Sequence, residues 1–252
     1  MNWRSWWEAL VGLVFPGIEL CNFCSKETDD ESWRGICSSC GRAVMEVSTN
    51  LRACPRCGYF SAHLPCPNCD DWDNTLPRIM GVIPYDGMYR ELMYCLKYGG
   101  KKELAVPLGH LMARKVRQAG LQKIIGLIVP VPLHPGREQE RGYNQSALLA
   151  REIGSELGIT CAAALDRVNY ERKQTGLSRR ERKVNLQDAF RLKPGWEIKG
   201  KTVLLVDDIV TTGSTLSAAA RCLRQDGGAG AVFGLTWAAG SDYQQNFEYL
   251  SN

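Results

Sequence analysis

Residues 203–215 have the sequence VLLVDDIVTTGST, an apolar run followed by two carboxylates and a turn rich in threonine and glycine. The run from Val203 to Val206 lacks polar alternation, which indicates a strand buried on both faces of a parallel sheet. Ligands of such sheets bind at the carboxyl ends of the strands, where we expect Asp207 and Asp208 to leave the sheet. The turn then offers hydroxyls and backbone N–H groups at the positive end of the next helix. The segment therefore predicts a sugar-phosphate site.

This segment resembles the signature of the type I phosphoribosyltransferases, in which a hydrophobic strand, two acidic residues and a T-T-G-x-T turn bind phosphoribosyl pyrophosphate. The resemblance implies that Asp207 and Asp208 contact the ribose 2′- and 3′-hydroxyls. The implied cradle of the 5′-phosphate consists of Thr211, Thr212, Gly213, Ser214 and Thr215. Gly213 has no Cβ to keep the backbone away from a ligand. The alternative is an ordinary strand, turn and helix, but two adjacent carboxylates with no cation in the next three positions are hard to explain by packing.

The second pattern is a set of four Cys-x-x-Cys pairs in the first 70 residues. The eight cysteines are Cys21, Cys24, Cys37, Cys40, Cys54, Cys57, Cys66 and Cys69. Each pair places two thiolates on one tight turn, and two pairs complete the four-sulfur shell that zinc prefers at structural sites. The simplest grouping joins the first four and the last four cysteines into a double zinc ribbon, while a crossed grouping stays open. Because four thiolates leave no open position for substrate, both ions are expected to be structural.

A disulfide framework is the competing interpretation, and it requires an oxidising compartment and normally a secretion signal. The first 16 residues contain three tryptophans and a short apolar run, but no small-residue cleavage site follows. The run is too short to span a bilayer. We expect it to form a short amphipathic helix that packs on the ribbon, with attachment to a membrane surface as the alternative. The chain is therefore predicted to bind zinc in the reducing cytoplasm, with no membrane span.

Length and composition fit two folded units of a soluble protein. A chain of 252 residues with 44% hydrophobic and 23% charged residues is ordinary for a globular protein. The cysteine-dense segment ends at the polar residues 70–74, which predicts an N-terminal helix and double zinc ribbon over residues 1–75 and a larger domain over residues 76–252. The net charge of +4 is mild, but residues 170–185 hold six cations and two carboxylates, and this excess of four equals that of the whole chain.

Alternating strands and helices after residue 76 predict an α/β fold with a mostly parallel sheet. The expected strands are 79–85, 125–131, 165–168, 190–192, 203–206 and 231–237. The expected helices are 89–97, 103–119, 145–157 and 214–226. Asn144 is a suitable N-cap for the third of these helices.

Three further segments extend the resemblance to nearly the whole chain. They are YDG at 85–87 with LKYGG at 96–100, VPVPLHP at 129–135 with ERGYNQS at 140–146, and KQTGLS at 173–178. Behind a double ribbon, this order is similar to the ComF family of competence proteins, which join a ribbon domain to a phosphoribosyltransferase-like domain. The resemblance implies the handling of incoming single-stranded DNA during natural transformation, with a DNA-uptake helicase as a partner.

The same resemblance assigns roles to two basic segments. In the transferases, donor groups must meet the charge that develops on the departing pyrophosphate. Arg137 and Arg141 correspond to the loop that holds the pyrophosphate, and residues 170–185 to the mobile loop that closes over the reaction. Lys173 is expected to reach the pyrophosphate, while Mg²⁺ bridges the pyrophosphate and the ribose hydroxyls. A solvated turn and a flexible charged stretch are the alternatives for the two segments.

Two classes of function remain. In the first, the chain is a zinc-containing protein that binds phosphoribosyl pyrophosphate and engages single-stranded DNA or a protein of the uptake machinery. In the second, it is an active phosphoribosyltransferase with an unidentified acceptor, and Asp207, Asp208, Lys173 and Arg137 are its candidate catalytic residues. No segment resembles the small hood that normally selects an acceptor base, so binding is better supported than turnover.

Overall fold

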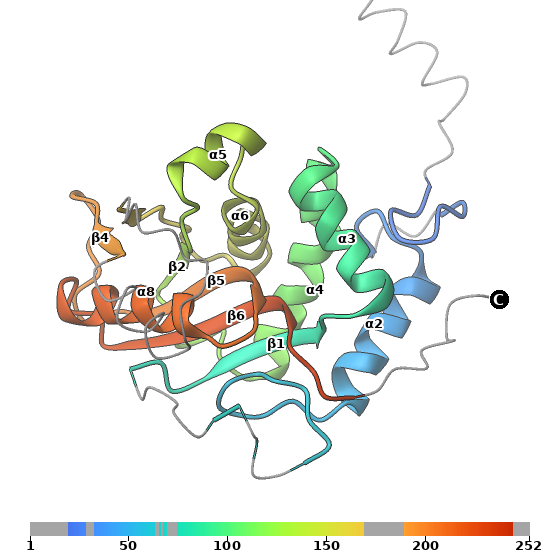
Figure 1. Cartoon of the computed structure of the whole chain (residues 1–252), viewed down its shortest axis with the longest axis horizontal. Helices are drawn as coiled ribbons and strands as arrows, with labels where there is room; N and C mark the ends of the chain where they lie inside the picture. The colour runs from blue at the N-terminus through green and yellow to red at the C-terminus, as the bar shows by residue number, and fades with distance from the viewer. Residues whose placement is uncertain are drawn as a thin grey trace, which may run out of the picture.

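The computed structural model describes residues 20–28, 33–63, 66, 68, 69, 75–168 and 189–243. Its centre is a four-stranded parallel sheet with the strand order β1-β6-β5-β2 (Figure 1). The four strands are β1 (Ile79–Pro84), β2 (Leu127–Pro130), β5 (Thr202–Val210) and β6 (Ala231–Ala239). The expected α/β fold with a mostly parallel sheet is therefore confirmed.

Helices connect these strands and cover the sheet. They are α3 (Gly87–Tyr98), the 3-10 turn η2 (Lys102–Leu104), α4 (Ala105–Gln118), α5 (Pro135–Arg141), α6 (Gln145–Leu157) and α8 (Ser214–Gln225). The cysteine-rich segment contributes α2 (Ser38–Asn50), and β3 (Leu165–Arg167) forms an antiparallel pair with β4 (Phe190–Leu192). The sequence patterns missed α2 and α5 and placed the start of β2 two residues too early.

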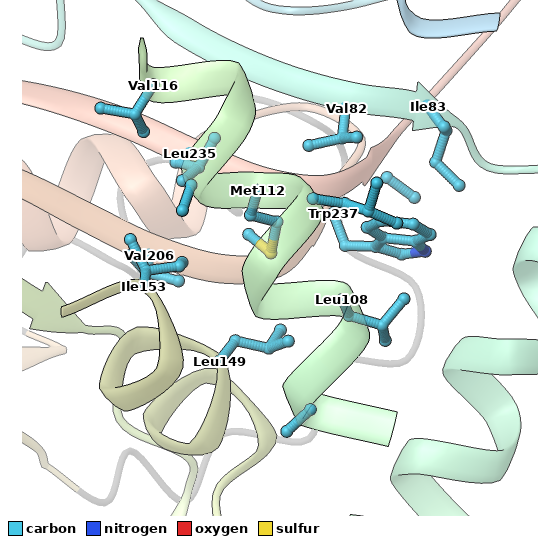
Figure 2. Close-up of a cluster of buried hydrophobic side chains, with 14 of the residues drawn as sticks. Val82, Ile83, Leu108, Met112, Val116, Leu149, Ile153, Val206, Leu235 and Trp237 are labelled. Atoms are coloured by element: carbon cyan, nitrogen blue, oxygen red, sulfur yellow. The ribbon is translucent and has the colours of Figure 1, made fainter. Parts of the chain in front are cut away.

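The sheet is buried on both faces, so alternate residues of β5 enter different cores. Leu204 and Val206 lie in the core that α4 and α6 cover, and Leu205 lies in the core beneath α8 (Figure 1). Figure 2 shows the first core, where Met112 of α4 and Trp237 of β6 are both fully buried. Burial on two faces is the physical reason for the unbroken apolar run in β5.

The cysteine-rich segment packs directly against this sheet. Ile36 and Cys40 belong to the same core as Trp237, and the ring of Phe23 meets the Trp237 ring edge to face at a centroid distance of 6.4 Å. Gly81 of β1 allows a further contact, because a Cβ there would lie 3.1 Å from the carbonyl oxygen of Gly58. The division into residues 1–75 and 76–252 stays a prediction, and the helix expected in the first 16 residues lies outside the described part of the chain.

Within the ranges that the structure describes, no helix is both long enough and apolar enough to cross a membrane.

Candidate metal and sugar-phosphate sites

The eight cysteines of the Cys-x-x-Cys pairs form two separate clusters. Within each cluster the four sulfurs lie within 4.8 Å of one another. One cluster is Cys21, Cys24, Cys37 and Cys40, and the other is Cys54, Cys57, Cys66 and Cys69. The structure therefore favours the sequential grouping over the crossed grouping that spacing alone left open.

The distances between sulfurs test what the clusters can hold. The Sγ atoms of Cys24 and Cys37 are 3.8 Å apart, and those of Cys57 and Cys66 are 3.7 Å apart. Four thiolates about 2.3 Å from a central zinc ion, at the corners of a tetrahedron, lie about 3.8 Å from one another. A disulfide requires about 2.05 Å, and all eight cysteines are free. The two clusters thus fit metal ions and are consistent with zinc.

Backbone N–H groups in the first cluster favour the thiolate form, which is the form that binds a metal cation. The Sγ atom of Cys21 accepts hydrogen bonds from the backbone N–H groups of Phe23 and Cys24. Burial opposes ionisation of the Cys21 thiol, but these and other donors together outweigh it and lower its pKa to about 7. In the second cluster burial raises the pKa of Cys57. A bound cation would remove this penalty, because it stabilises the thiolate form.

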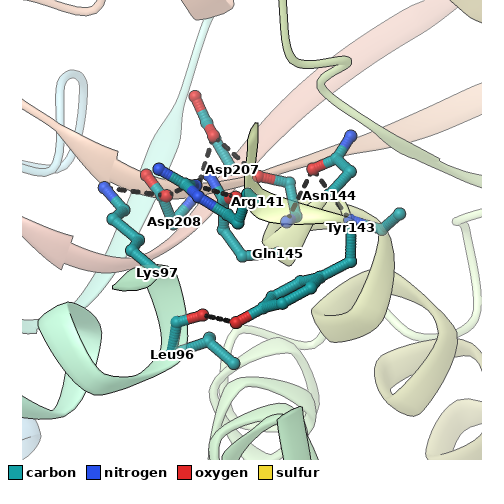
Figure 3. A network of polar contacts seen from close by, with 10 residues as sticks. Leu96, Lys97, Arg141, Tyr143, Asn144, Gln145, Asp207 and Asp208 are labelled. Carbon is teal, nitrogen blue, oxygen red and sulfur yellow. Dashed lines mark hydrogen bonds and ion pairs between the residues drawn. The ribbon is translucent and has the colours of Figure 1, made fainter. Parts of the chain in front are cut away.

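The two carboxylates form the centre of a polar network (Figure 3). Lys97 Nζ lies 2.9 Å from Asp208 Oδ2, which also accepts a hydrogen bond of 2.5 Å from Gln145 Nε2. Asp207 Oδ1 accepts a hydrogen bond of 2.9 Å from the Ser146 hydroxyl. Three segments far apart in the sequence therefore meet at the carboxylates, namely α3, the first turn of α6 and β5.

The structure corrects the expectation that the two carboxylates leave the sheet. β5 continues to Val210, because β6 stays paired with it beyond Asp207. On the other side β2 ends, and its last pair joins Pro130 to Val206. That edge of β5 is open from Asp207 onward, and the first turn of α6 lies against it. The acids therefore sit at the end of β2, at the carboxyl edge of the sheet.

Burial of the two adjacent carboxylates disfavours their ionisation. The side chain of Asp208 is 8% exposed and that of its partner Lys97 is 19% exposed. Burial, and then the charge of Asp208, raises the pKa of Asp207 to about 7, although the backbone N–H of Asp208, the Ser146 hydroxyl and Lys97 act in the opposite direction. A carboxyl with a raised pKa in a polar site is a common feature of functional sites.

The turn after β5 has the geometry of an anion cradle. Gly213 adopts a positive φ of 73° and is the N-cap of α8, so a side chain at this position would strain the backbone. The hydroxyls of Thr212 and Ser214 lie 2.9 Å apart beside the first N–H groups of the helix. The second cysteine cluster contacts this turn, because Asn68 Nδ2 donates a hydrogen bond of 3.0 Å to the carbonyl oxygen of Thr211. The sequence did not predict this contact.

The two arginines of the expected pyrophosphate loop lie on a helix instead. Arg137 and Arg141 belong to α5, which His134 caps by accepting a hydrogen bond from the N–H of Gly136. Pro135 at the first turn favours a helix start, and this signal was available in the sequence. Arg141 donates to the side-chain oxygen of Gln145, so it joins the network around Asp208 (Figure 3).

Other candidate residues fall outside the network or outside the described residues. Arg137 is exposed on α5 and lines a hollow of about 290 Å³ together with Arg141 and Lys97. Lys173 lies outside the described part of the chain. The structure adds Arg167 of β3 to the candidate site residues. Burial lowers the pKa of the Arg167 guanidinium, and the nearby charge of Asp207 acts in the opposite direction. No local pattern in the sequence marked Arg167.

The fold and these sites define a class of protein. The phosphoribosyl transferase domain family matches residues 144–246, a range that includes α6, the paired carboxylates and the turn. The protein therefore contains a phosphoribosyltransferase-like domain, preceded by two four-cysteine clusters that are compatible with a double zinc ribbon.

Relatives that align over most of the chain identify the family. The DNA utilization protein YhgH of Salmonella typhimurium is 38% identical over 224 residues, which is 86% of this chain and 95% of that protein. Competence protein F of Haemophilus influenzae is 32% identical over 77% of this chain and 86% of its own length. Competence protein ComFC of Bacillus subtilis is 30% identical over 86% of this chain and 93% of its own length. The chain belongs to this ComF/YhgH family, and the resemblance drawn from the sequence is confirmed.

Proposed function

We propose that this protein binds phosphoribosyl pyrophosphate with Mg²⁺ at the carboxyl edge of β5 and acts on single-stranded DNA during natural transformation, in the cytoplasm. The observation that carries the first part is the placement of Asp207 and Asp208 on β5 just before the Thr211 to Thr215 turn, with Lys97 paired to Asp208 and Arg141 joined to the same network through Gln145. The second part is supported by the names of the relatives, which are DNA utilization and competence proteins.

Each part of the sugar pyrophosphate has a candidate partner. The ribose diol would donate hydrogen bonds to Asp207 and Asp208, because the second oxygen of each carboxylate has no partner among the described residues. The 5′-phosphate would lie in the turn, at the positive end of α8. Arg137, Arg141 and the predicted contact Lys173 would bind the pyrophosphate. Bound Mg²⁺ would supply charge that offsets the pyrophosphate oxygens.

Replacing both acids tests the ligand directly. We expect Asp207→Asn with Asp208→Asn to weaken Mg²⁺-dependent binding of phosphoribosyl pyrophosphate by about tenfold or more, because each hydrogen bond to a charged group is worth about 1.5–3 kcal/mol. Titration calorimetry with and without Mg²⁺ measures the loss. The single variant Asp207→Asn answers the same question if the double variant does not fold.

The control for this titration is Asp166→Asn. Asp166 lies on β3, its side chain is 63% exposed, and it pairs with Lys193 outside the network. This control should bind phosphoribosyl pyrophosphate as the unmodified protein does. Equal affinity of the control and of the acid variants would refute the proposed site.

The basic segment 170–185 provides a test of the nucleic-acid part. Replacing Arg179, Arg180 and Arg182 with glutamine should weaken single-stranded DNA binding and flatten its salt dependence. Three lost phosphate contacts reduce the slope of log affinity against log salt by about 2, at about 0.7 for each contact. Fluorescence anisotropy at several salt concentrations gives the slope. Replacing three exposed cations elsewhere with glutamine, namely Lys123, Arg191 and Lys199, should leave the slope unchanged. An unchanged slope in the Arg179, Arg180 and Arg182 variant would exclude a role of segment 170–185 in DNA binding.

Turnover is the second candidate function, and the match to the phosphoribosyl transferase domain favours it. In this case the arginines of α5 would meet the charge that develops on the departing pyrophosphate. The decisive measurement is the release of pyrophosphate from phosphoribosyl pyrophosphate in the presence of candidate bases. Binding of phosphoribosyl pyrophosphate without any release for any acceptor would leave the chain as a binding protein.

A further inference from the structure

Helix α3 presents two aromatic side chains to the outside of the molecule. Tyr94 and Tyr98 are 64% and 65% exposed, and their ring centroids are 5.2 Å apart with an interplanar angle of 48°. The opposite side of α3 is buried, as the 6% exposure of Tyr89 and the full burial of Met93 show. Two large exposed rings one helical turn apart form a patch of aromatic surface that a partner can reach.

The two rings line a strip of surface that leads to the paired carboxylates. A hollow of about 570 Å³ along α3 is lined by both tyrosines, Arg90 and Lys97. The second hollow, of about 290 Å³, shares Tyr98 and Lys97 with it and extends to Arg137 of α5. Since Lys97 Nζ contacts Asp208 at 2.9 Å, the strip adjoins the proposed phosphoribosyl site.

The strip is also positively charged. Four cations and two carboxylates line the two hollows together, and these are Arg90, Lys97, Arg137, Arg141, Glu91 and Glu140. Because Lys97 also pairs with Asp208, the strip has an excess of one positive charge, and its three arginines are the cations available to phosphates. The guanidinium of Arg141 lies 4.8 Å from the centre of the Tyr98 ring, and Lys102 Nζ lies 4.7 Å from the centre of the Tyr143 ring. Aromatic rings interleaved with cations are the combination that proteins use to bind single-stranded nucleic acid, because bases stack on rings while cations follow the phosphates.

We propose that Tyr94 and Tyr98, here called the tyrosine platform, stack bases of a single DNA strand whose phosphates follow the cations of the strip. An extended strip made of two adjoining open hollows suits a polymer, whereas selection of one free base requires enclosure. The proposal rests on the proposed action on single-stranded DNA and names the surface that performs it. It also places the strand next to the phosphoribosyl site, so that one ligand can affect the binding of the other.

Removing the rings tests the tyrosine platform. Tyr94→Ala with Tyr98→Ala should weaken binding of a labelled oligothymidylate of about 15 nucleotides by about tenfold or more, because a stacked base contributes about 1–3 kcal/mol. Tyr94→Phe with Tyr98→Phe should retain the affinity, since stacking needs the ring and not the hydroxyl. The salt dependence should stay the same in both variants, because no charge changes. Fluorescence anisotropy measures all of these values.

Two controls separate stacking from other effects. An abasic strand of the same length keeps the phosphates but has no bases, so its affinity should not respond to loss of the rings. Trp196→Ala removes a 43% exposed aromatic residue outside the strip and should leave binding unchanged. Exposed positions tolerate substitution, and thermal melting confirms that each variant is folded.

The possible outcomes distinguish this inference from the proposed function. If the unmodified protein binds the oligonucleotide and the alanine variant binds it equally well, the tyrosine platform is refuted while the proposed function stands. If the unmodified protein binds no single strand, both fail. If the alanine variant loses affinity for a free nucleoside monophosphate and not for the strand, the platform selects a free nucleotide and the proposal is overturned. Binding of phosphoribosyl pyrophosphate should stay intact in the alanine variant.

Discussion

Replacement of Cys57 by serine is expected to remove one of two zinc ions from each chain and to lower the melting temperature by about 6–20 °C. The Sγ atom of Cys57 is buried and lies 3.7 Å from that of Cys66. Structural zinc in finger peptides binds with about 10–16 kcal/mol, and loss of one thiolate forfeits part of this energy. A loss of about 3–5 kcal/mol corresponds to about 6–20 °C in a protein of this size, at about 2–4 °C for each kcal/mol. Metal analysis and thermal melting under reducing conditions measure both effects.

Two further cysteine variants make this experiment specific. Cys40→Ser should remove the other ion, because the two clusters are separate. Cys161→Ser changes a half-buried cysteine outside both clusters and should retain two ions with a small change in melting temperature. A purified protein with no zinc, or a Cys57→Ser variant that keeps both ions, would contradict the assignment of structural zinc to the clusters.

The second cluster should also influence the turn after β5. Asn68 lies between Cys66 and Cys69 and donates a hydrogen bond to the Thr211 carbonyl oxygen, so the second cysteine cluster helps to hold the turn in place. Loss of the ion from this cluster would release that contact, and Cys57→Ser is therefore expected to weaken binding of phosphoribosyl pyrophosphate more than Cys40→Ser does. An ion in the second cluster would then have a structural role and would also strengthen the binding of phosphoribosyl pyrophosphate.

Local patterns were sufficient to predict the central strands and the cysteine clusters. The run from Val203 to Val206 is apolar because both faces of β5 are covered, and burial of this kind leaves a direct trace in the sequence. The Cys-x-x-Cys spacing likewise reflects the geometry of a four-sulfur shell. In both cases the physical requirement, burial of a strand or the geometry of a metal shell, acts on residues that are close together in the chain.

The partners of the carboxylates were beyond local patterns. Gln145 contacts Asp208 only because β2 is the neighbour of β5 and its last pair lies at Val206, two positions before Asp208, which opens the edge where α6 begins. Lys97 reaches the same carboxylate from α3, which follows the strand at the far edge of the sheet. Such contacts depend on strand order and strand length, and neither quantity follows from the pattern of one segment.

The carboxylate pair should make the protein less stable as the pH rises. The pKa of Asp207 in the folded state is about 7, while its ordinary value is 3.8, so the folded state holds a proton that the unfolded state loses first. The folded state is therefore favoured below pH 4, and this advantage is lost as the pH rises toward 7. With about 1.4 kcal/mol for each unit of pKa shift, the full cost above pH 7 is about 4 kcal/mol.

Asp207→Asn removes this cost, because the amide stays neutral and its oxygen can still accept the Ser146 hydrogen bond. The variant should exceed the unmodified protein in stability, with a margin that grows by about 2 kcal/mol between pH 5.5 and 7.5 and then levels off. This growth corresponds to about 4–8 °C in melting temperature. Asp166→Asn, at an exposed carboxylate, should show no such growth. A margin for Asp207→Asn that stays constant across this pH range would mean that Asp207 is already ionised in the folded protein at pH 5.5, and that Lys97 neutralises the pair more completely than its contact with Asp208 implies.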